Sequence, residues 1–193
     1  MSESNALLVI DMQERFGWDI PKKPSQERHY IGNNIAVGLQ RARCTFRPII
    51  FIVYGGSPYR NPEYAQKYQL RGSCEACNEA IGMVDFLKHR HDANSFEPVF
   101  FKNQGDAFSN PNLHSYLLEL GVREVTLMGC NTYSCVASTA IGALKKELGV
   151  TLLANCAYDS SFGLLKSQDE RDYWREVFAY NGQRVTVGDI PRV

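Results

Sequence analysis

Six short apolar runs recur along the chain, and longer stretches of mixed polar and apolar residues separate them. They are residues 6–10, 48–55, 97–102, 124–129, 150–156 and 184–189. The run PIIFIVYG is rich in β-branched and aromatic side chains, which favour strands. Continuous apolar runs of this length are typical of strands buried on both faces, as in a parallel sheet covered by helices.

Helical patterns occupy several of the stretches between these runs. They are residues 28–44, 110–121, 135–148 and 167–181. The second begins with Asn110 as the predicted N-cap and Pro111 at the first helical position, and it ends on Gly121, a common C-terminal signal. The fourth opens with Ser167 and Glu170 at the spacing of a capping box. Strands that alternate with helices predict an α/β fold.

The length and composition fit a single domain that spans residues 1–193. A chain of 193 residues forms one domain by default, and 44% hydrophobic residues are enough for a sizeable core. The stretch 55–80 is irregular and rich in Gly, Pro and polar residues. It is predicted as a long loop or lid that belongs to the same domain.

Charge and hydropathy exclude several classes of function. The 21 basic and 21 acidic side chains give a formal net charge of zero, which argues against nucleic acid or an anionic membrane surface as a partner. No run of 18 or more apolar residues is present, so we expect no membrane span. The N-terminal MSESNALLVIDMQ lacks the charged segment and long apolar run of a signal peptide. We therefore expect a cytoplasmic protein whose six cysteines are reduced thiols.

Residues capable of chemistry follow three of the predicted strands. In an open parallel sheet, ligands bind beyond the carboxyl ends of the strands. Asp11 follows the first strand, Lys102 ends the third, and the fourth leads through CNTYS to Cys135 at the start of a helix. Each residue alone has an ordinary explanation, as a turn residue, a solvated lysine or a small buried side chain. Their predicted convergence at one edge of the sheet favours function.

The chemistry of this edge centres on the thiol. A thiol attacks as the thiolate, and both a helix N-terminus and the charge of Lys102 are expected to lower the pKa of Cys135. The loop before Cys135 is expected to direct backbone N–H groups at an anion, as an oxyanion hole requires. Asp11 is then placed to take the thiol proton and return it to a leaving amine.

Three segments carry a resemblance to a known family: ALLVIDMQERF, FFKNQGDAFSN and LMGCNTYSCVASTAIGAL. Their order is similar to that of the motifs of the isochorismatase-like cysteine hydrolases, which include isochorismatases, nicotinamidases and N-carbamoylsarcosine amidases. With the elements between them, the resemblance covers nearly the whole chain. It implies a three-layer fold, in which a Rossmann-like open six-stranded parallel sheet has helices on both faces. It also implies a homo-oligomer that acts on a small-molecule substrate.

The resemblance implies a role for each residue at the predicted edge. Asp11 is the acid/base, Lys102 its electrostatic partner and Cys135 the nucleophile of a catalytic triad. A non-proline cis peptide is implied between Cys130 and Asn131. It directs the N–H groups of Asn131 and Cys135 at the substrate oxygen, so these two residues form the implied oxyanion hole.

Aromatic side chains are the candidates for substrate binding. Phe108 resembles the family phenylalanine that lines the pocket, and Phe16 and Tyr133 are predicted to line the pocket with it. Two arginines of the irregular stretch, Arg60 and Arg71, either hold a substrate carboxylate or face solvent.

The chain departs from the metal-dependent members of the family. Nicotinamidases bind a metal through an Asp-x-His motif after the second strand, and the corresponding segment YGGSPYRNPEY has neither Asp nor His. We therefore predict no metal and no cofactor. Asn155 stands where many members have Asp after the fifth strand.

A separate group of candidate metal ligands is formed by Cys74, Cys77, His89 and His91. The Cys-x-x-Cys spacing suits zinc, whereas His-x-His is tighter than the usual finger spacing. A zinc site and a redox pair remain alternatives. Loop or helix residues without a metal are the favoured interpretation.

The sequence thus predicts a cysteine hydrolase that cleaves a C–N bond of a small amide or ureide through an acyl-enzyme on Cys135. One alternative is an isochorismatase-type vinyl-ether hydrolase, which needs the Asp11 acid but no thiol, so the presence of Cys135 argues against it. The other alternative is a thiol- or zinc-binding interaction protein built around Cys74 and Cys77.

Overall fold

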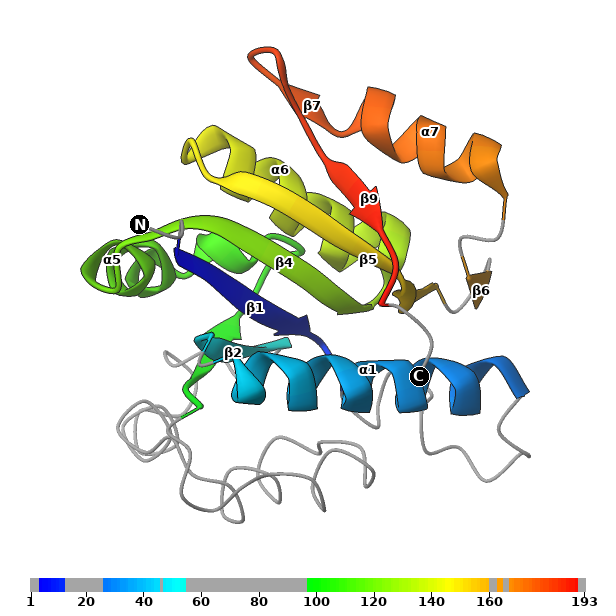
Figure 1. Cartoon of the computed structure of the whole chain (residues 1–193). Coiled ribbons are helices and arrows are strands. Elements are labelled where there is room, and N and C mark those ends of the chain that lie inside the picture. Colours follow the sequence, from blue (N-terminus) through cyan, green and yellow to red (C-terminus); the bar gives the residue numbers. More distant parts are fainter. Residues whose placement is uncertain are drawn as a thin grey trace.

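The computed structural model describes residues 4–12, 26–45, 47–54, 97–159, 163–164 and 167–190 (Figure 1). Its strands are β1 (Ser4–Ile10), β2 (Ile49–Tyr54), β3 (Val99–Lys102), β4 (Val122–Cys130), β5 (Gly149–Asp159), β6 (Gly163–Leu164), β7 (Ala179–Tyr180), β8 (Gln183–Arg184) and β9 (Thr186–Gly188). Its α-helices are α1 (Gln26–Cys44), α5 (Pro111–Glu119), α6 (Ala137–Lys145) and α7 (Gln168–Val177). A 3₁₀ turn, η2 (Ala107–Ser109), precedes α5, and a π turn, η3 (Thr132–Val136), precedes α6.

The main sheet holds parallel strands in the order β3-β2-β1-β4-β5-β9. This order confirms the predicted six-stranded parallel sheet, and the two-residue strand β6 adds an antiparallel pair at the end of β5. From β1 the chain runs outward to β2 and β3, and it then returns to the other side of β1 to build β4 and β5. The winding therefore reverses between β1 and β4. The crevice outside the carboxyl ends of these two strands is where such a sheet binds ligands.

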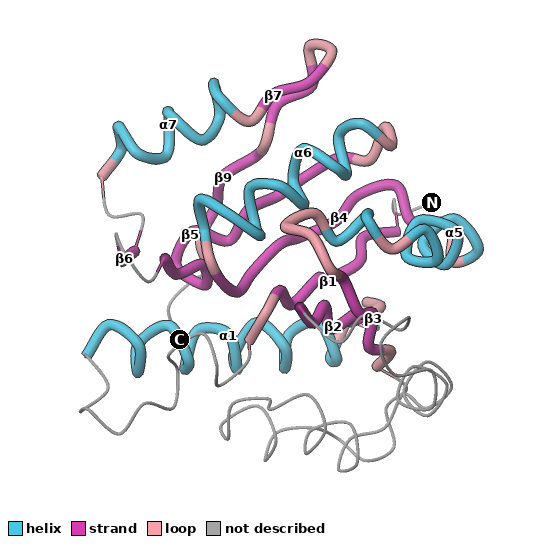
Figure 2. The backbone as a smooth tube through the Cα atoms, turned by 180° about the vertical axis from the view of Figure 1, so that it is seen from behind, coloured by secondary structure: helices cyan, strands magenta, loops and turns pink. Residues whose placement is uncertain are grey.

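Helices cover both faces of the sheet, as predicted. In Figure 1 the strands β4 and β5 lie in front of α6, and in Figure 2, seen from behind, α6 lies in front of them. Leu7 and Val9 of β1 join the apolar cluster that contains α1. Leu8 and Ile10 join the cluster that contains α5, α6 and α7. The apolar run of β1 is continuous because its alternate side chains enter two separate cores.

The predicted helix ends agree with the structure at α5 and at the start of α7. Asn110 caps α5 by accepting a hydrogen bond from the backbone N–H of Asn112 at 3.0 Å. Gly121 follows the helix with a φ of 68°, a conformation that glycine adopts without a side-chain penalty. The capping box of α7 is also present, with Ser167 and Glu170 each bonding the backbone of the other.

Helix boundaries differ from the prediction at both ends of the segment expected over 135–148, where α6 ends at Lys145, and at the end of the segment expected over 167–181. The helical segment expected from residue 135 begins at Thr132, because the π turn η3 joins β4 to α6. The helix expected to reach Asn181 ends at Val177, and a small hairpin of β7 and β8 follows it. Asn181 and Gly182 at its tip have φ values of 49° and 80°. This Asn-Gly pair is the usual signal for such a turn and outweighs the helical pattern.

No helix among the described residues is both long enough and apolar enough to cross a membrane. The 19-residue helix α1 has the length, but polar and charged side chains interrupt it throughout.

Gly129 lets the ends of β1 and β4 approach each other. It pairs with Ile10 in the sheet and has a φ of 121°, and a Cβ at this position would overlap the backbone of Ile10. Gly129→Ala should therefore lower the free energy of unfolding by roughly 2–4 kcal/mol, because both backbone strain and overlap oppose it. Urea denaturation measures the loss.

Gly188→Ala is the matched control, because a Cβ there meets none of the described atoms within 4 Å. The control should stay within about 0.5 kcal/mol of the wild type. Equal stabilities of the two variants would contradict the close approach of β1 and β4.

Candidate active site

A buried ion pair lies at the carboxyl end of the sheet. Lys102, the last residue of β3, places its Nζ 2.9 Å from Oδ2 of Asp11, and the two side chains are 0% and 1% exposed. The same Nζ donates a hydrogen bond to the carbonyl oxygen of Gly105 at 2.6 Å and lies 5.6 Å from the centre of the Tyr54 ring. The Lys102 ammonium thus contacts the Asp11 carboxylate, the Gly105 carbonyl and the Tyr54 ring. The carbonyl and the ring help to hold its positive charge beside the carboxylate.

Cys135 joins this pair from the π turn η3. Its side chain is buried and interacts electrostatically with both Asp11 and Lys102. Burial raises the pKa of Cys135 above its ordinary value. The charge of Asp11 and its hydrogen bond with the thiol raise it further, while Lys102 acts in the opposite direction. The structure therefore brings the acid, the base and the thiol of the sequence prediction into one cluster.

The direction of this pKa shift corrects one expectation. A helix N-terminus and Lys102 were expected to lower the pKa of Cys135, and the structure gives a raised one. The physical reason is that loss of hydration and the neighbouring carboxylate both oppose a second negative charge, and together they exceed the effect of Lys102. The raised pKa favours the protonated thiol, which lies beside a carboxylate that can accept its proton.

The loop between β4 and Cys135 is held by several hydrogen bonds. The peptide bond between Cys130 and Asn131 is cis, as the family resemblance implied. The carbonyl oxygen of Asn131 accepts from the backbone N–H groups of Ser134 and Val136, both at 3.1 Å. These donors lie on either side of Cys135 in the chain. The nucleophile candidate thus sits in a turn with a defined backbone geometry.

Asp159 also holds this loop and was not among the predicted site residues. Its buried carboxylate accepts a hydrogen bond from the backbone N–H of Tyr133 at 3.2 Å. The sequence ended the fifth strand at residue 156, whereas β5 continues to Asp159 and reaches the edge of the site. Extending the strand through CAYD would have placed an acid at the same edge as Asp11. Asn155 lies within β5 and instead binds the backbone of Ile190 through two hydrogen bonds, both of 2.9 Å.

Phe108 lies on the same face of the sheet as Cys135. It is buried in the 3₁₀ turn η2 and belongs to the same apolar cluster as Cys135. Asp106 caps this turn by accepting the N–H of Phe108 at 2.8 Å, and the N–H of Ala107 donates to Thr139 of α6 at 3.0 Å. The segment after Lys102 is therefore fastened to the helix that follows Cys135.

Tyr133 directs its ring toward α7. The ring centres of Tyr173 and Trp174 lie 6.5 and 6.4 Å from it. Burial raises the pKa of the Tyr133 phenol, and the nearby carboxylates of Glu170 and Asp159 add to the increase. The predicted contact of Tyr133 with substrate stays a prediction.

A family model of the isochorismatase domain matches residues 5–180. The chain belongs to the isochorismatase-domain family. It is 27% identical to the uncharacterized isochorismatase family protein YaaI of Bacillus subtilis strain 168, over 81% of each chain. Its fold is similar to the crystal structure of N-carbamoylsarcosine amidase from Thermoplasma acidophilum, with a TM-score of 0.68, 19% identity and 96% of each chain covered. It is also similar to an isochorismatase from Pseudomonas putida KT2440, with a TM-score of 0.66, 24% identity and coverage of 96% and 87%.

Several predicted residues of this isochorismatase-domain protein lie outside the described residues. They are Phe16, Arg60, Arg71, Cys74, Cys77, His89 and His91, together with the rest of the irregular stretch 55–80. Within the described ranges, the thiols of Cys44, Cys135 and Cys156 form no disulfide. No group of three or more His, Cys, Asp or Glu side chains is arranged around a common point in the part of the chain that the structure describes.

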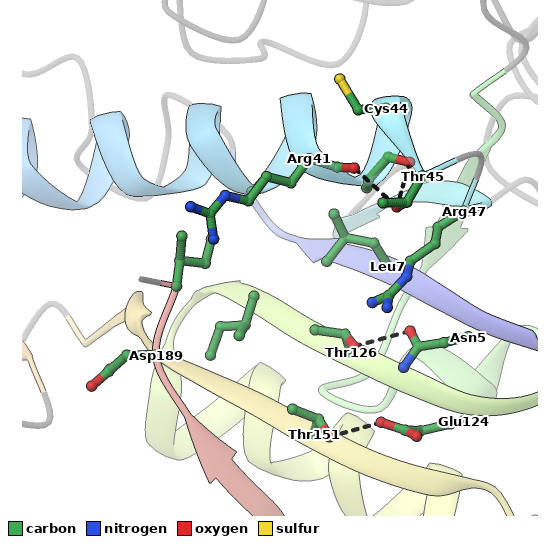
Figure 3. A pocket seen from close by; sticks show the side chains of 14 residues that line it. Asn5, Leu7, Arg41, Cys44, Thr45, Arg47, Glu124, Thr126, Thr151 and Asp189 are labelled. Carbon is green, nitrogen blue, oxygen red and sulfur yellow. Dashed lines mark hydrogen bonds between the residues drawn. The ribbon is translucent and has the colours of Figure 1, made fainter. Parts of the chain in front are cut away.

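A groove of about 630 Å³ lies at the opposite end of the sheet (Figure 3). It is bordered by Arg41 in the last turn of α1 and by Arg47 beyond that helix, and polar side chains from the beginnings of β1, β4 and β5 form its floor. Hydrogen bonds join Thr126 to Asn5 and Thr151 to Glu124 there. None of the three candidate catalytic side chains lines this groove. The groove is therefore separate from the candidate active site.

Replacing Lys102 by Met leaves the Asp11 carboxylate buried without its ion-pair partner. We expect the free energy of unfolding at pH 7 to fall by about 3–5 kcal/mol, because the buried carboxylate loses the ammonium that lies 2.9 Å away and offsets its desolvation cost. Urea denaturation at constant pH measures this loss.

The double variant Asp11→Asn/Lys102→Met removes both charges and tests the origin of the loss. Asn tolerates the φ of 51° at position 11, so the backbone can stay as it is. The double variant should be more stable than Lys102→Met by at least about 1 kcal/mol. A double variant no more stable than Lys102→Met would show that the ion pair is not the cause.

Proposed function

We propose that this isochorismatase-domain protein is a cysteine hydrolase that cleaves a C–N bond of a small amide or ureide. The observation that carries the proposal is the cluster of Asp11, Lys102 and the Cys135 thiol at the carboxyl end of the sheet, where the winding reverses between β1 and β4. A protonated thiol beside a buried carboxylate is a nucleophile with its general base already in place. The solved structures of similar fold include proteins named as amidases, which agrees with this chemistry.

The reaction begins when Asp11 takes the proton of Cys135 and Sγ attacks the carbonyl carbon of the substrate. The tetrahedral oxyanion forms near the backbone N–H groups of Asn131 and Cys135. The C–N bond then breaks, and Asp11 returns the proton to the leaving nitrogen, so that an amine departs and a thioester remains on Cys135. Water attacks the thioester with Asp11 again acting as base, and the carboxylic acid or carbamic acid product leaves with the thiol regenerated.

Lys102 has an electrostatic role in this scheme. Its ammonium is fixed 2.9 Å from the Asp11 carboxylate and opposes the rise in the pKa of Cys135. While the proton moves from sulfur to carboxylate, the negative charge moves from Asp11 to Cys135, and Lys102 stabilises it at both places. The buried site strengthens this effect because little water screens the charges.

Cys135→Ala should abolish turnover of any substrate that the wild type cleaves through the thioester. We expect the rate to fall on the order of 10³-fold or more, since no other group in the scheme forms the covalent intermediate. The measurement is a panel of small amides and ureides, with intact-mass detection of the acyl adduct on the wild-type protein. Cys44→Ala, which removes an exposed thiol at the end of α1, is the control and should keep full activity.

Turnover of an amide by Cys135→Ala at the wild-type rate would overturn the proposal. Isochorismate belongs in the same panel. Its hydrolysis without an adduct, in both the wild type and Cys135→Ala, would show instead the vinyl-ether chemistry that does not need the thiol.

Asp159→Ala tests the support of the loop that carries the proposed oxyanion donors. Without the carboxylate, the N–H of Tyr133 loses its acceptor, and the turn can shift relative to the substrate oxygen. We expect kcat to fall about tenfold while KM changes little, because the contact matters most in the transition state. Asp159→Asn keeps an acceptor oxygen and should stay within about threefold of the wild type. Equal rates for Asp159→Ala and the wild type would remove Asp159 from the scheme.

A further inference from the structure

We infer that Cys130 is a positioning residue, whose buried thiol holds the backbone of Asp11 and thereby directs the Asp11 carboxylate toward Lys102 and Cys135. The inference rests on the proposed function only in naming Asp11 as the acid/base. The contact itself is direct: Sγ of Cys130 donates to the carbonyl oxygen of Asp11 at 3.1 Å, and both residues are buried. In this role the Cys130 thiol is a hydrogen-bond donor. It is distinct from the proposed nucleophile, Cys135, which lies five residues later in the chain.

The backbone of Asp11 is held by hydrogen bonds on both sides. Its φ of 51° lies in the left-handed region, which Asp and Asn adopt more often than other non-glycine residues. Its N–H donates to the carbonyl oxygen of Ile52 in β2 at 2.9 Å. Its carbonyl oxygen accepts the Cys130 thiol on the other side, from β4. The residue that carries the carboxylate is therefore held from both neighbouring strands.

The register of the sheet brings the thiol to this carbonyl. Ile10 pairs with Gly129, so Cys130 comes alongside the next residue, Asp11. The absence of a side chain at Gly129 permits this approach, since a Cβ would overlap the backbone of Ile10. A residue one position earlier in β4 would direct its side chain to the opposite face of the sheet.

A thiol suits this position because it is small and largely apolar, yet can donate a hydrogen bond. Cys130 belongs to the apolar cluster on the α1 face of the sheet, together with Val9, Met128 and Cys156. Serine retains a donor for the Asp11 carbonyl at nearly the same place, whereas alanine retains none. The two replacements therefore separate the hydrogen bond from the packing.

Cys130 also begins the loop that leads to the nucleophile. It forms the cis peptide with Asn131, whose N–H is one of the two proposed oxyanion donors. One residue thus contacts the backbone of the acid/base and is covalently joined to the oxyanion loop. A displacement at Cys130 is expected to alter the distance between these two parts of the site, which affects the transition state more than substrate binding.

The test compares Cys130→Ala with Cys130→Ser by two readouts. For a substrate found with the amide panel, Cys130→Ala should lower kcat by about 10- to 100-fold with KM within about twofold, and Cys130→Ser should recover most of the loss. The second readout is the pH dependence of Cys135 alkylation by iodoacetamide, followed by peptide mass. In Cys130→Ala its midpoint should move to lower pH, because the carboxylate that raises the pKa of Cys135 is no longer held against the thiol.

Cys156→Ala is the matched control. It removes another fully buried thiol of the same apolar cluster and should change neither kcat nor the alkylation midpoint, even where stability falls. Cys130→Val, a non-donor that fills more of the site, replaces Cys130→Ala if the latter does not fold.

Two outcomes would overturn the inference: a non-donor variant of Cys130 with wild-type kcat and alkylation midpoint, or a Cys130→Ser variant that behaves like Cys130→Ala. The alkylation readout needs no substrate. If Cys135→Ala proves fully active and the proposed function fails, the shift of the midpoint still decides whether Cys130 positions Asp11.

Discussion

The buried ion pair between Asp11 and Lys102 is the interaction on which the arrangement of the site depends. The two charges come from strands that are not neighbours, β1 and β3, with β2 between them. Neither charge would be tolerated alone at this depth, so the pair requires that the carboxyl ends of these strands keep their relative positions. The apolar clusters on the two faces of the sheet supply this rigidity, and the site sits where both clusters end.

A second constraint is the close approach of β1 and β4 at the point where the winding reverses. Gly129 permits this approach because it has no side chain to overlap the backbone of Ile10. The segments that follow these two residues carry the candidate site residues. Asp11 follows β1 directly, and the turn that carries Cys135 follows β4. The Asp11 carboxylate and the Cys135 thiol are therefore placed relative to each other by the pairing of two strands, and the Cys130 thiol contacts the backbone of Asp11 across this pair.

Electrostatics shows most clearly what the linear sequence could not decide. The helix start and Lys102 both pointed to a thiol of lowered pKa, and each of these features is present. The depth of burial of Cys135 and the direct approach of Asp11 reverse the sign. Desolvation and short-range charge interactions depend on distances across the sheet, which no spacing along the chain contains.

The sequence by itself determined the order of strands and helices along the chain. It also singled out Asp11, Lys102 and Cys135, which end or follow three of the strands. The spacing of apolar residues, the helix-capping residues and the three short motifs are local features, so the amino-acid sequence alone contains them. Only the tertiary structure decided that β5 extends to Asp159 and that the thiol of Cys130 meets the carbonyl of Asp11. These features depend on strand register and on contacts between residues far apart in the sequence, which tertiary packing alone establishes.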